Sequence, residues 1–465
     1  MAAFRGAVEA GSHALETDLH LSKDGVVMLS HDATLKRCFK DIRKVADCDW
    51  EVLRTLRTVK KPSQSMPRLL DLLEYLGQPE QRDVWLLLDI KTSNLPTLLP
   101  TPTPQSARSY AEVATYPARY ASLITLSHST ISMAPNKNFS WTHFFPPKPE
   151  FTDNDISQSL SGKVYMVTGA NCGMGKELAR VLYSKSARVY ITCRTKEKCQ
   201  KALADIRGAG SAGKGGEVIP LQMDLADLQT VRTAAQAFLA SDREPMLHGL
   251  FNNDGVMVGD NPGNTAQGYE EAIGVNCIGT FLFTQLLTPA LAAAARSQSA
   301  ANTVRVVWLS GFGLEQFAPE GRGVDLDTLD EPKPGIARYG ISKAGVWLLA
   351  VEYARRHKAD GIVSVAINPG NIRTELARNQ GMALKLIAGA IVYPVIRGVY
   401  TQLYAVFSNE IATQFDYTKE WVIPFGRIAA LRADLIPATQ PTEEGGNGNA
   451  KQFWEWNQDK VQEYM

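Results

Sequence analysis

The sequence predicts an α/β protein whose larger part is a doubly wound parallel sheet. Two observations predict this class. An apolar run at residues 164–167 breaks at a glycine-rich turn and continues into a helical pattern from about Gly175, as in a buried parallel strand and its crossover helix. Apolar runs and helical patterns then keep alternating toward the C-terminus. The expected strands are residues 164–167, 187–192, 218–221, 247–251, 304–309 and 363–367, and the longest expected helices are 269–287 and 337–356.

Composition narrows the class of protein further. The chain has 465 residues, enough for two or three domains, and a formal net charge of +1 without a basic block, so we expect no nucleic-acid partner. Its six cysteines show no metal-binding spacing, which indicates reduced thiols and a cytoplasmic protein. The N-terminus shows no apolar signal region.

The most apolar late stretch, residues 382–407, is interrupted by Lys385, Pro394 and Arg397. These interruptions argue against a transmembrane segment. We expect a helical pair that covers an apolar pocket, and peripheral contact with a membrane surface stays open as an alternative.

Acidic residues and a histidine fall at the ends of apolar runs in the first hundred residues. A stretch of strand-like alternation places Glu16 and Asp18 on one face, a second strand leads into His31 and Asp32, and a later run ends at Asp89. Carboxylates and a histidine at the ends of successive strands suit a divalent cation and an acid–base residue. Solvated strand ends are the alternative interpretation.

As a group these segments resemble the start of the glycerophosphodiester phosphodiesterase family, a metal-dependent (β/α)8 barrel. The resemblance implies Glu16, Asp18 and Asp89 as vestigial metal ligands and His31 as an acid–base residue. It ends near Leu98, whereas a barrel needs roughly 200 residues or more.

We therefore expect residues 1–98 to be a truncated, inactive barrel fragment, with a metal-dependent phosphodiesterase as an alternative. Residues 99–144 are rich in Pro, Ser and Thr and are expected to form a linker. The larger domain is expected over residues 145–465.

Glycines at positions 169, 173 and 175 lie between the first strand of this larger domain and its helix, in the spacing Thr-Gly-x-x-x-Gly-x-Gly. Such a turn lets backbone amides approach a pyrophosphate, with the positive end of the helix behind them. A tight strand-to-helix connection without a ligand is the alternative.

Polar residues follow the later strands in turn. Arg194 and Lys196 follow the second strand, where positive charge suits the 2′-phosphate of NADP, although a solvated basic turn has the same sequence. Asp224 follows the third strand and is placed to accept from an adenine amino group or to cap the next helix. Asn276 is a polar residue inside an apolar helix, either catalytic or hydrogen-bonded in the core.

Tyr339 and Lys343 are four residues apart, so their side chains meet on one helix face. A tyrosine has an ordinary pKa near 10, and a neighbouring ammonium is expected to lower that pKa toward the range useful for acid–base chemistry. Thr374 and the backbone at Pro369 and Gly370, after the sixth strand, are expected to hold a carboxamide.

In this order the motifs resemble the short-chain dehydrogenase/reductase family, most nearly its fungal retinol-dehydrogenase-like members. The resemblance implies a Rossmann-like fold and NADP(H)-dependent interconversion of a carbonyl and an alcohol on a moderately large apolar substrate. It implies Tyr339 as the acid–base, Lys343 as the group that holds ribose hydroxyls, Asn276 as the holder of a relay water, and Ser310 as a fourth catalytic candidate. The implied cofactor-binding residues are Gly169, Asn171, Gly173, Met174, Gly175, Arg194, Asp224, Leu225, Asn252, Tyr339, Lys343, Pro369, Gly370 and Thr374.

Two positions depart from the family pattern. Gly311 occupies the place of the catalytic serine, and Ser310, its neighbour along the strand end, is expected to face the other way. Asp254 occupies the place of a small alanine near the pyrophosphate, where its charge would weaken binding. A catalytically impaired dinucleotide-binding protein is therefore the alternative function. A homo-oligomer and a monomer are both compatible with the sequence.

Overall fold

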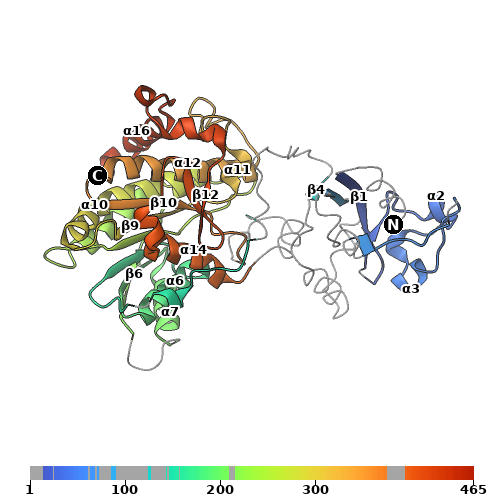
Figure 1. Ribbon diagram of the computed structural model, residues 1–465, viewed down its shortest axis with the longest axis horizontal. Coiled ribbons are helices and arrows are strands. Elements are labelled where there is room, and N and C mark those ends of the chain that lie inside the picture. Colours follow the sequence, from blue (N-terminus) through green and yellow to red (C-terminus); the bar gives the residue numbers. More distant parts are fainter. Residues whose placement is uncertain are drawn as a thin grey trace. The chain divides into compact units, whose positions relative to one another are not determined.

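The computed structural model describes residues 14–24, 26–60, 63–68, 71–72, 85–90, 124–126, 143, 146–156, 158–208, 215–373 and 393–465 (Figure 1). The chain divides into two compact units, Met1–Ala134 and Pro135–Met465.

The N-terminal unit contains a four-stranded sheet in the order β2-β1-β3-β4. Its strands are β1 (Ala14–Leu21), β2 (Val27–Leu29), β3 (Trp85–Ile90) and β4 (Ile124–Leu126), and its short helices include α2 (Lys36–Phe39), η1 (Val45–Asp47) and α3 (Trp50–Leu53). Strands β1, β3 and β4 are parallel, as in an incomplete (β/α)8 barrel, whereas β2 forms an antiparallel pair with β1. Strand β4 lies inside the segment expected to be a linker.

The candidate metal ligands of this unit lie on neighbouring strands. The backbone register of β1 and β3 pairs Asp18 with Asp89, and Glu16 is two residues earlier on β1. The side chains of these three residues lie outside the described part. His31 is described and exposed, with its Nδ1 3.0 Å from Asp32 Oδ1.

The C-terminal unit is built on an eight-stranded sheet in the order β12-β11-β10-β9-β8-β5-β6-β7. The strands are β5 (Val164–Val167), β6 (Arg188–Cys193), β7 (Glu217–Gln222), β8 (Gly249–Asn252), β9 (Val304–Leu309), β10 (Ile362–Ile367), β11 (Glu420–Ile423) and β12 (Arg427–Ala430). All neighbouring pairs are parallel except β11 with β12. This is the predicted doubly wound, Rossmann-like sheet, and its strand order reverses between β5 and β8.

Helices cover both faces of this sheet, and each face has its own apolar core. One core includes residues from α6 (Gly173–Ser184), α7 (Lys196–Gly208) and α14 (Val395–Phe407). The other includes residues from α8 (Leu228–Leu239), α10 (Thr280–Ser297), α12 (Gly335–His357) and α16 (Asn449–Val461). The remaining helices are η5 (Asp153–Asp155), α9 (Glu271–Ile273), η6 (Gly274–Gly279), α11 (Gly313–Phe317), α15 (Asn409–Thr413), η8 (Ala433–Thr439), η9 (Thr442–Glu444) and η10 (Gln462–Tyr464).

Helix α14 corrects the expectation of a helical pair over an apolar pocket. Its Val399, Leu403 and Val406 are buried with the core on the α6 face of the sheet. It is therefore a core helix, and the earlier part of the apolar stretch lies outside the described residues.

Among the described residues, one helix, Glu271–Ser297, is long and apolar enough to cross a membrane. Within the fold 72% of its most apolar window is buried, as in the core helix of a globular domain.

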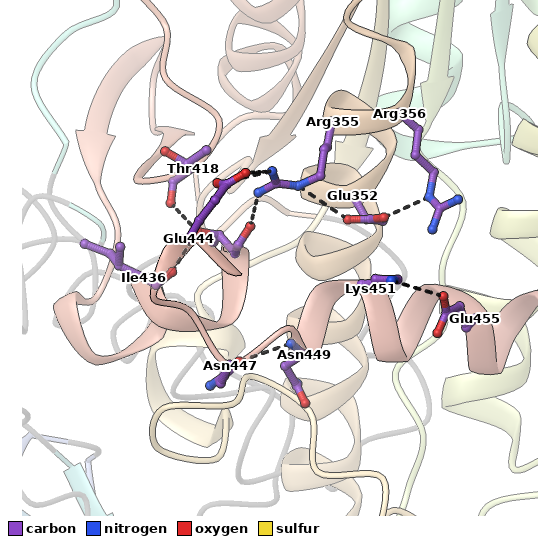
Figure 2. A network of polar contacts seen from close by, with 11 residues as sticks. Glu352, Arg355, Arg356, Thr418, Ile436, Glu444, Asn447, Asn449, Lys451 and Glu455 are labelled. Atoms are coloured by element: carbon purple, nitrogen blue, oxygen red, sulfur yellow. Dashed lines mark hydrogen bonds and ion pairs between the residues drawn. The ribbon is translucent and has the colours of Figure 1, made fainter. Parts of the chain in front are cut away.

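A polar network ties the C-terminal segment to α12 (Figure 2). Arg355 donates to the backbone oxygen of Thr439 at 2.7 Å and contacts Glu444 at 3.3 Å. Glu352, one turn earlier, contacts Arg356 at 2.8 Å, and the Arg356 guanidinium lies over the Trp454 ring. These contacts fix the C-terminal half of the helix that carries the predicted Tyr–Lys pair.

Candidate active site

The glycine-rich turn joins β5 to α6 at the carboxyl edge of the sheet. Gly169 and Gly173 have φ angles of +64° and +56°, a region that favours glycine. A β-carbon on Gly175 would lie 2.6 Å from Asn253 Nδ2 and 2.7 Å from the Gly169 oxygen, so the packing requires a glycine there too. In the described structure Cys172, the N-cap residue of α6, makes no side-chain capping hydrogen bond. The first-turn amides and the helix dipole thus suit the pyrophosphate of a dinucleotide.

Two other predicted cofactor residues belong to this turn. Asn171 donates to Cys172 Sγ at 3.3 Å. Met174 packs on α14, where a β-carbon on Gly398 would lie 2.5 Å from its sulfur.

The ends of β6 and β7 lie next to β5 in the strand order of the sheet. Arg194 and Lys196 are exposed directly after β6, as a 2′-phosphate site requires. Asp224 accepts from the Ala226 amide at 3.0 Å, and Leu225 is buried beside it. Asp227 is the N-cap residue of α8, so Asp224 does not cap that helix.

The two asparagines after β8 have different partners. Asn252 donates to Thr284 Oγ1 at 2.9 Å and so supports the strand from α10. Asn253 donates to the Thr168 oxygen at 2.9 Å and accepts from Gln402 at 3.2 Å. Asn253 therefore holds the glycine turn, a role that sequence reasoning missed although the Asn-Asn pair after an apolar strand is visible.

The predicted residues after β10 lie beside another residue that was missed. The Gly370 amide donates to Asn368 Oδ1 at 3.0 Å, with φ +89° at Gly370. Asn368 Nδ2 is 3.1 Å from Nδ1 of His143, a buried residue from the expected linker whose ring contacts Phe312 and Trp421. Pro369 lies in the same turn.

Thr374 lies outside the described residues. No local pattern marked His143, because its partners are far away in the sequence.

Tyr339 and Lys343 meet on α12, as the four-residue spacing predicted. Lys343 Nζ lies 5.5 Å from the centre of the Tyr339 ring and donates to the Leu309 backbone oxygen at 2.7 Å. Burial lowers the pKa of Lys343 to about 8, and it raises the pKa of Tyr339. The expectation that Lys343 lowers the pKa of Tyr339 is thus not met in the free chain, because desolvation of the phenol raises that pKa.

Asn276 lies in η6, a π-helical turn between α9 and α10. Its Oδ1 accepts from the Val256 amide at 2.8 Å, and its Nδ2 donates to the Val256 oxygen at 3.0 Å and Ser342 Oγ at 2.8 Å. A β-carbon on Gly255 would lie 3.0 Å from Asn276 Oδ1 and 3.2 Å from Lys343 Nζ, so these two groups border the same space. Among the described residues the Val256 amide is the donor to Oδ1, and an amide oxygen can accept two hydrogen bonds.

Ser310 and Gly311 face different partners. The Ser310 hydroxyl is buried and donates to the Lys343 backbone oxygen at 2.7 Å. A β-carbon on Gly311 would lie 3.8 Å from the Tyr339 hydroxyl and 3.9 Å from Lys343 Cγ. Position 311 therefore faces Tyr339, whereas the Ser310 hydroxyl stabilises α12 through its hydrogen bond to the helix backbone.

The structure thus gathers a phenol, an ammonium and an amide beside the carboxyl ends of β8 and β9. A phenol with an adjacent ammonium can pass a proton to or from a substrate oxygen.

Two family models match separate parts of this chain. Residues 163–316 match the short chain dehydrogenase family model, and residues 1–123 match that of the glycerophosphoryl diester phosphodiesterase family, beyond the expected end at Leu98.

Curated relatives match the C-terminal part of the chain. A short-chain dehydrogenase/reductase of Neocamarosporium betae is 44% identical over 330 residues, which cover 70% of this chain and 93% of the relative. One of Phomopsis amygdali is 43% identical over 331 residues, covering 70% of this chain and 97% of the relative.

Proposed function

Because the chain belongs to the short-chain dehydrogenase/reductase family, whose members are oxidoreductases, we propose that it interconverts a carbonyl and an alcohol with NADP(H) as its dinucleotide. The observation that carries the proposal is the contact between Tyr339 and Lys343 on α12. Lys343 also donates to Leu309 at the end of β9, and the glycine turn follows β5 in the same sheet. The bound nicotinamide would supply or accept the hydride.

The residues of this chain have separate tasks in that reaction. Tyr339 donates a proton to the carbonyl oxygen during reduction and accepts it back during oxidation. Lys343, with a pKa of about 8, is largely protonated at neutral pH. Its positive charge favours the phenolate form of Tyr339 that remains after the tyrosine has donated its proton. Asn276 borders the space next to Lys343 Nζ and is placed to hold a water that returns the proton.

Exposed Arg194 and Lys196 support the choice of NADP(H) over NAD(H), since both can pair with a 2′-phosphate. The apolar composition of residues 382–392, between β10 and α14, supports a moderately large apolar substrate.

A purified full-length chain and its Tyr339→Phe variant test the reaction. With NADPH and a panel of apolar ketones and aldehydes, we expect turnover that falls by about 10²- to 10⁴-fold in the variant. Dinucleotide affinity should be retained, since the phenylalanine keeps the ring. Arg194→Ala should weaken NADPH binding by about tenfold or more and leave NADH binding nearly unchanged.

The second candidate function is dinucleotide binding without efficient catalysis. It is favoured by Gly311, which places no hydroxyl beside Tyr339, and by Ser310, whose hydroxyl is engaged with the α12 backbone. Dinucleotide binding without turnover on any carbonyl or alcohol of the panel would support this candidate over the first.

A further inference from the structure

Asp254 lies against the glycine turn, at which the proposed dinucleotide would bind. It follows β8, and Gly169 follows the adjacent strand β5, so the two residues stand on either side of the point where the strand order reverses. Dinucleotides bind in the crevice at this point in open α/β sheets. A β-carbon on Gly169 would lie 2.7 Å from both Cγ and Oδ1 of Asp254. The carboxyl group therefore rests on the glycine turn.

Backbone contacts hold Asp254 in this position. Its amide donates to Thr168 Oγ1 at 2.9 Å, and its Oδ1 accepts from the Gly255 amide at 3.0 Å. One carboxyl oxygen thus has a fixed donor within the residue's own turn, which anchors the group against Gly169.

The charged and titratable groups around Asp254 come from several elements. Arg194 after β6 and Lys343 on α12 favour its ionised form, and Asp224 after β7 opposes it. The Cys193 thiol at the end of β6 is also close enough to interact with the carboxyl group. Burial is the largest influence and raises the pKa of Asp254 despite the two cations.

A dinucleotide adds two phosphate charges to the same crevice. An ionised carboxylate and a pyrophosphate repel each other strongly at short range in a partly desolvated site. Protonation of the carboxyl group removes the repulsion and turns it into a hydrogen-bond donor for a phosphate or ribose oxygen.

We propose that Asp254 sets the dinucleotide affinity of this chain and that its carboxyl group takes up one proton from solvent when the dinucleotide binds. The inference rests on the proposed function in that a dinucleotide must bind. Affinity then falls as the pH rises above the pKa of Asp254 in the free chain, by about tenfold per pH unit until the complex also loses the proton.

Isothermal titration calorimetry of the full chain with NADH tests this inference. NADH lacks the 2′-phosphate, whose own titration would add to the signal of NADPH. Titrations between about pH 6 and 9, in buffers of different ionisation enthalpy, measure how many protons the wild-type chain takes up when NADH binds. This measurement needs no substitution.

Asp254→Asn keeps the shape of the protonated carboxyl, and Asp254→Ala removes the group. We expect the wild type to take up close to one proton, and both variants to take up none and to bind at least about tenfold more tightly at the upper end of the pH range. Asp242→Asn is the matched control, since it removes an exposed carboxylate between α8 and β8, at the opposite edge of the sheet.

The possible outcomes separate the two proposals. Binding of NADH by the wild type without proton uptake overturns this inference and leaves the proposed function standing. No binding of NADH or NADPH by the wild type or either folded variant at any pH overturns both.

Discussion

The Tyr339 hydroxyl lies 3.8 Å from the position that a β-carbon on Gly311 would take. That distance is ordinary van der Waals contact, so a small side chain fits at position 311 without displacing its neighbours. A serine there would add a hydroxyl donor beside the phenol. One preorganised donor to a developing oxyanion contributes about 10²- to 10³-fold in rate.

We therefore predict that Gly311→Ser raises kcat by up to about that factor. Gly311→Ala is the control, because it fills the same space without a donor and should not raise kcat. Steady-state kinetics with NADPH and the best substrate of the panel measures both variants. An equal rise in the alanine variant would contradict the hydrogen-bond explanation.

A second prediction concerns Ser310, whose hydroxyl donates to the Lys343 backbone oxygen in a buried position. Ser310→Ala should lower the free energy of unfolding by about 0.5 to 1.5 kcal/mol, because it removes one buried hydrogen bond to a carbonyl inside α12. The effect on kcat should be small compared with that of Tyr339→Phe. Urea unfolding and kinetics on the same preparation separate a bracing role from a catalytic one, and a loss of kcat with unchanged stability would favour catalysis.

The sequence was sufficient for six of the eight strands of the sheet and for the Tyr–Lys pair, because both depend on short-range patterns, whereas β11 and β12 were not predicted. Buried apolar runs place β5 and β9 at the expected residues, and four-residue spacing places Tyr339 and Lys343 on one helix face. The glycine turn was equally visible, since its positive φ angles are tied to residue type.

Contacts between segments that are far apart in the sequence could not be predicted from short-range patterns. His143 contacts Asn368, which is more than two hundred residues away in the sequence, and α14 is buried in the core although its sequence was expected to form part of a helical pair over an apolar pocket. The pKa of Tyr339 depends on burial, which sequence spacing does not report. Hydrophobic periodicity predicts which face of a helix or strand is buried, whereas these features depend on which residues pack against that face.

A third prediction concerns the network between α12 and the C-terminal segment (Figure 2). Arg355 joins the Thr439 backbone oxygen and Glu444, and its contact with Glu352 is 3.7 Å. Arg355→Ala should lower the free energy of unfolding by about 1.5 to 3 kcal/mol, as expected for loss of charge-assisted hydrogen bonds in a partly buried place.

Lys451→Ala is the control for this network, because its contact with Glu455 is exposed and 4.0 Å long. It should change stability by less than about 1 kcal/mol. Thermal and urea unfolding compare the two variants. Equal effects would show that the network does not hold α12.

A fourth prediction concerns acid stability and His248, which is buried and accepts the Val164 amide proton at Nδ1, 3.1 Å away. Burial lowers the pKa of His248 to about 4, and the pKa of His143 to about 4 as well. In the unfolded chain both should titrate near the ordinary value of about 6.5. The unfolded state therefore binds more protons between these limits, and stability falls as the pH drops from about 6.5 toward 4. The loss is at most about 3 kcal/mol for each histidine.

His248→Asn keeps an acceptor for the Val164 amide without titrating, so the stability of this variant should depend less steeply on pH over this range. Urea unfolding followed by tryptophan fluorescence at several pH values measures the slopes, and equal slopes for wild type and His248→Asn would contradict the assignment.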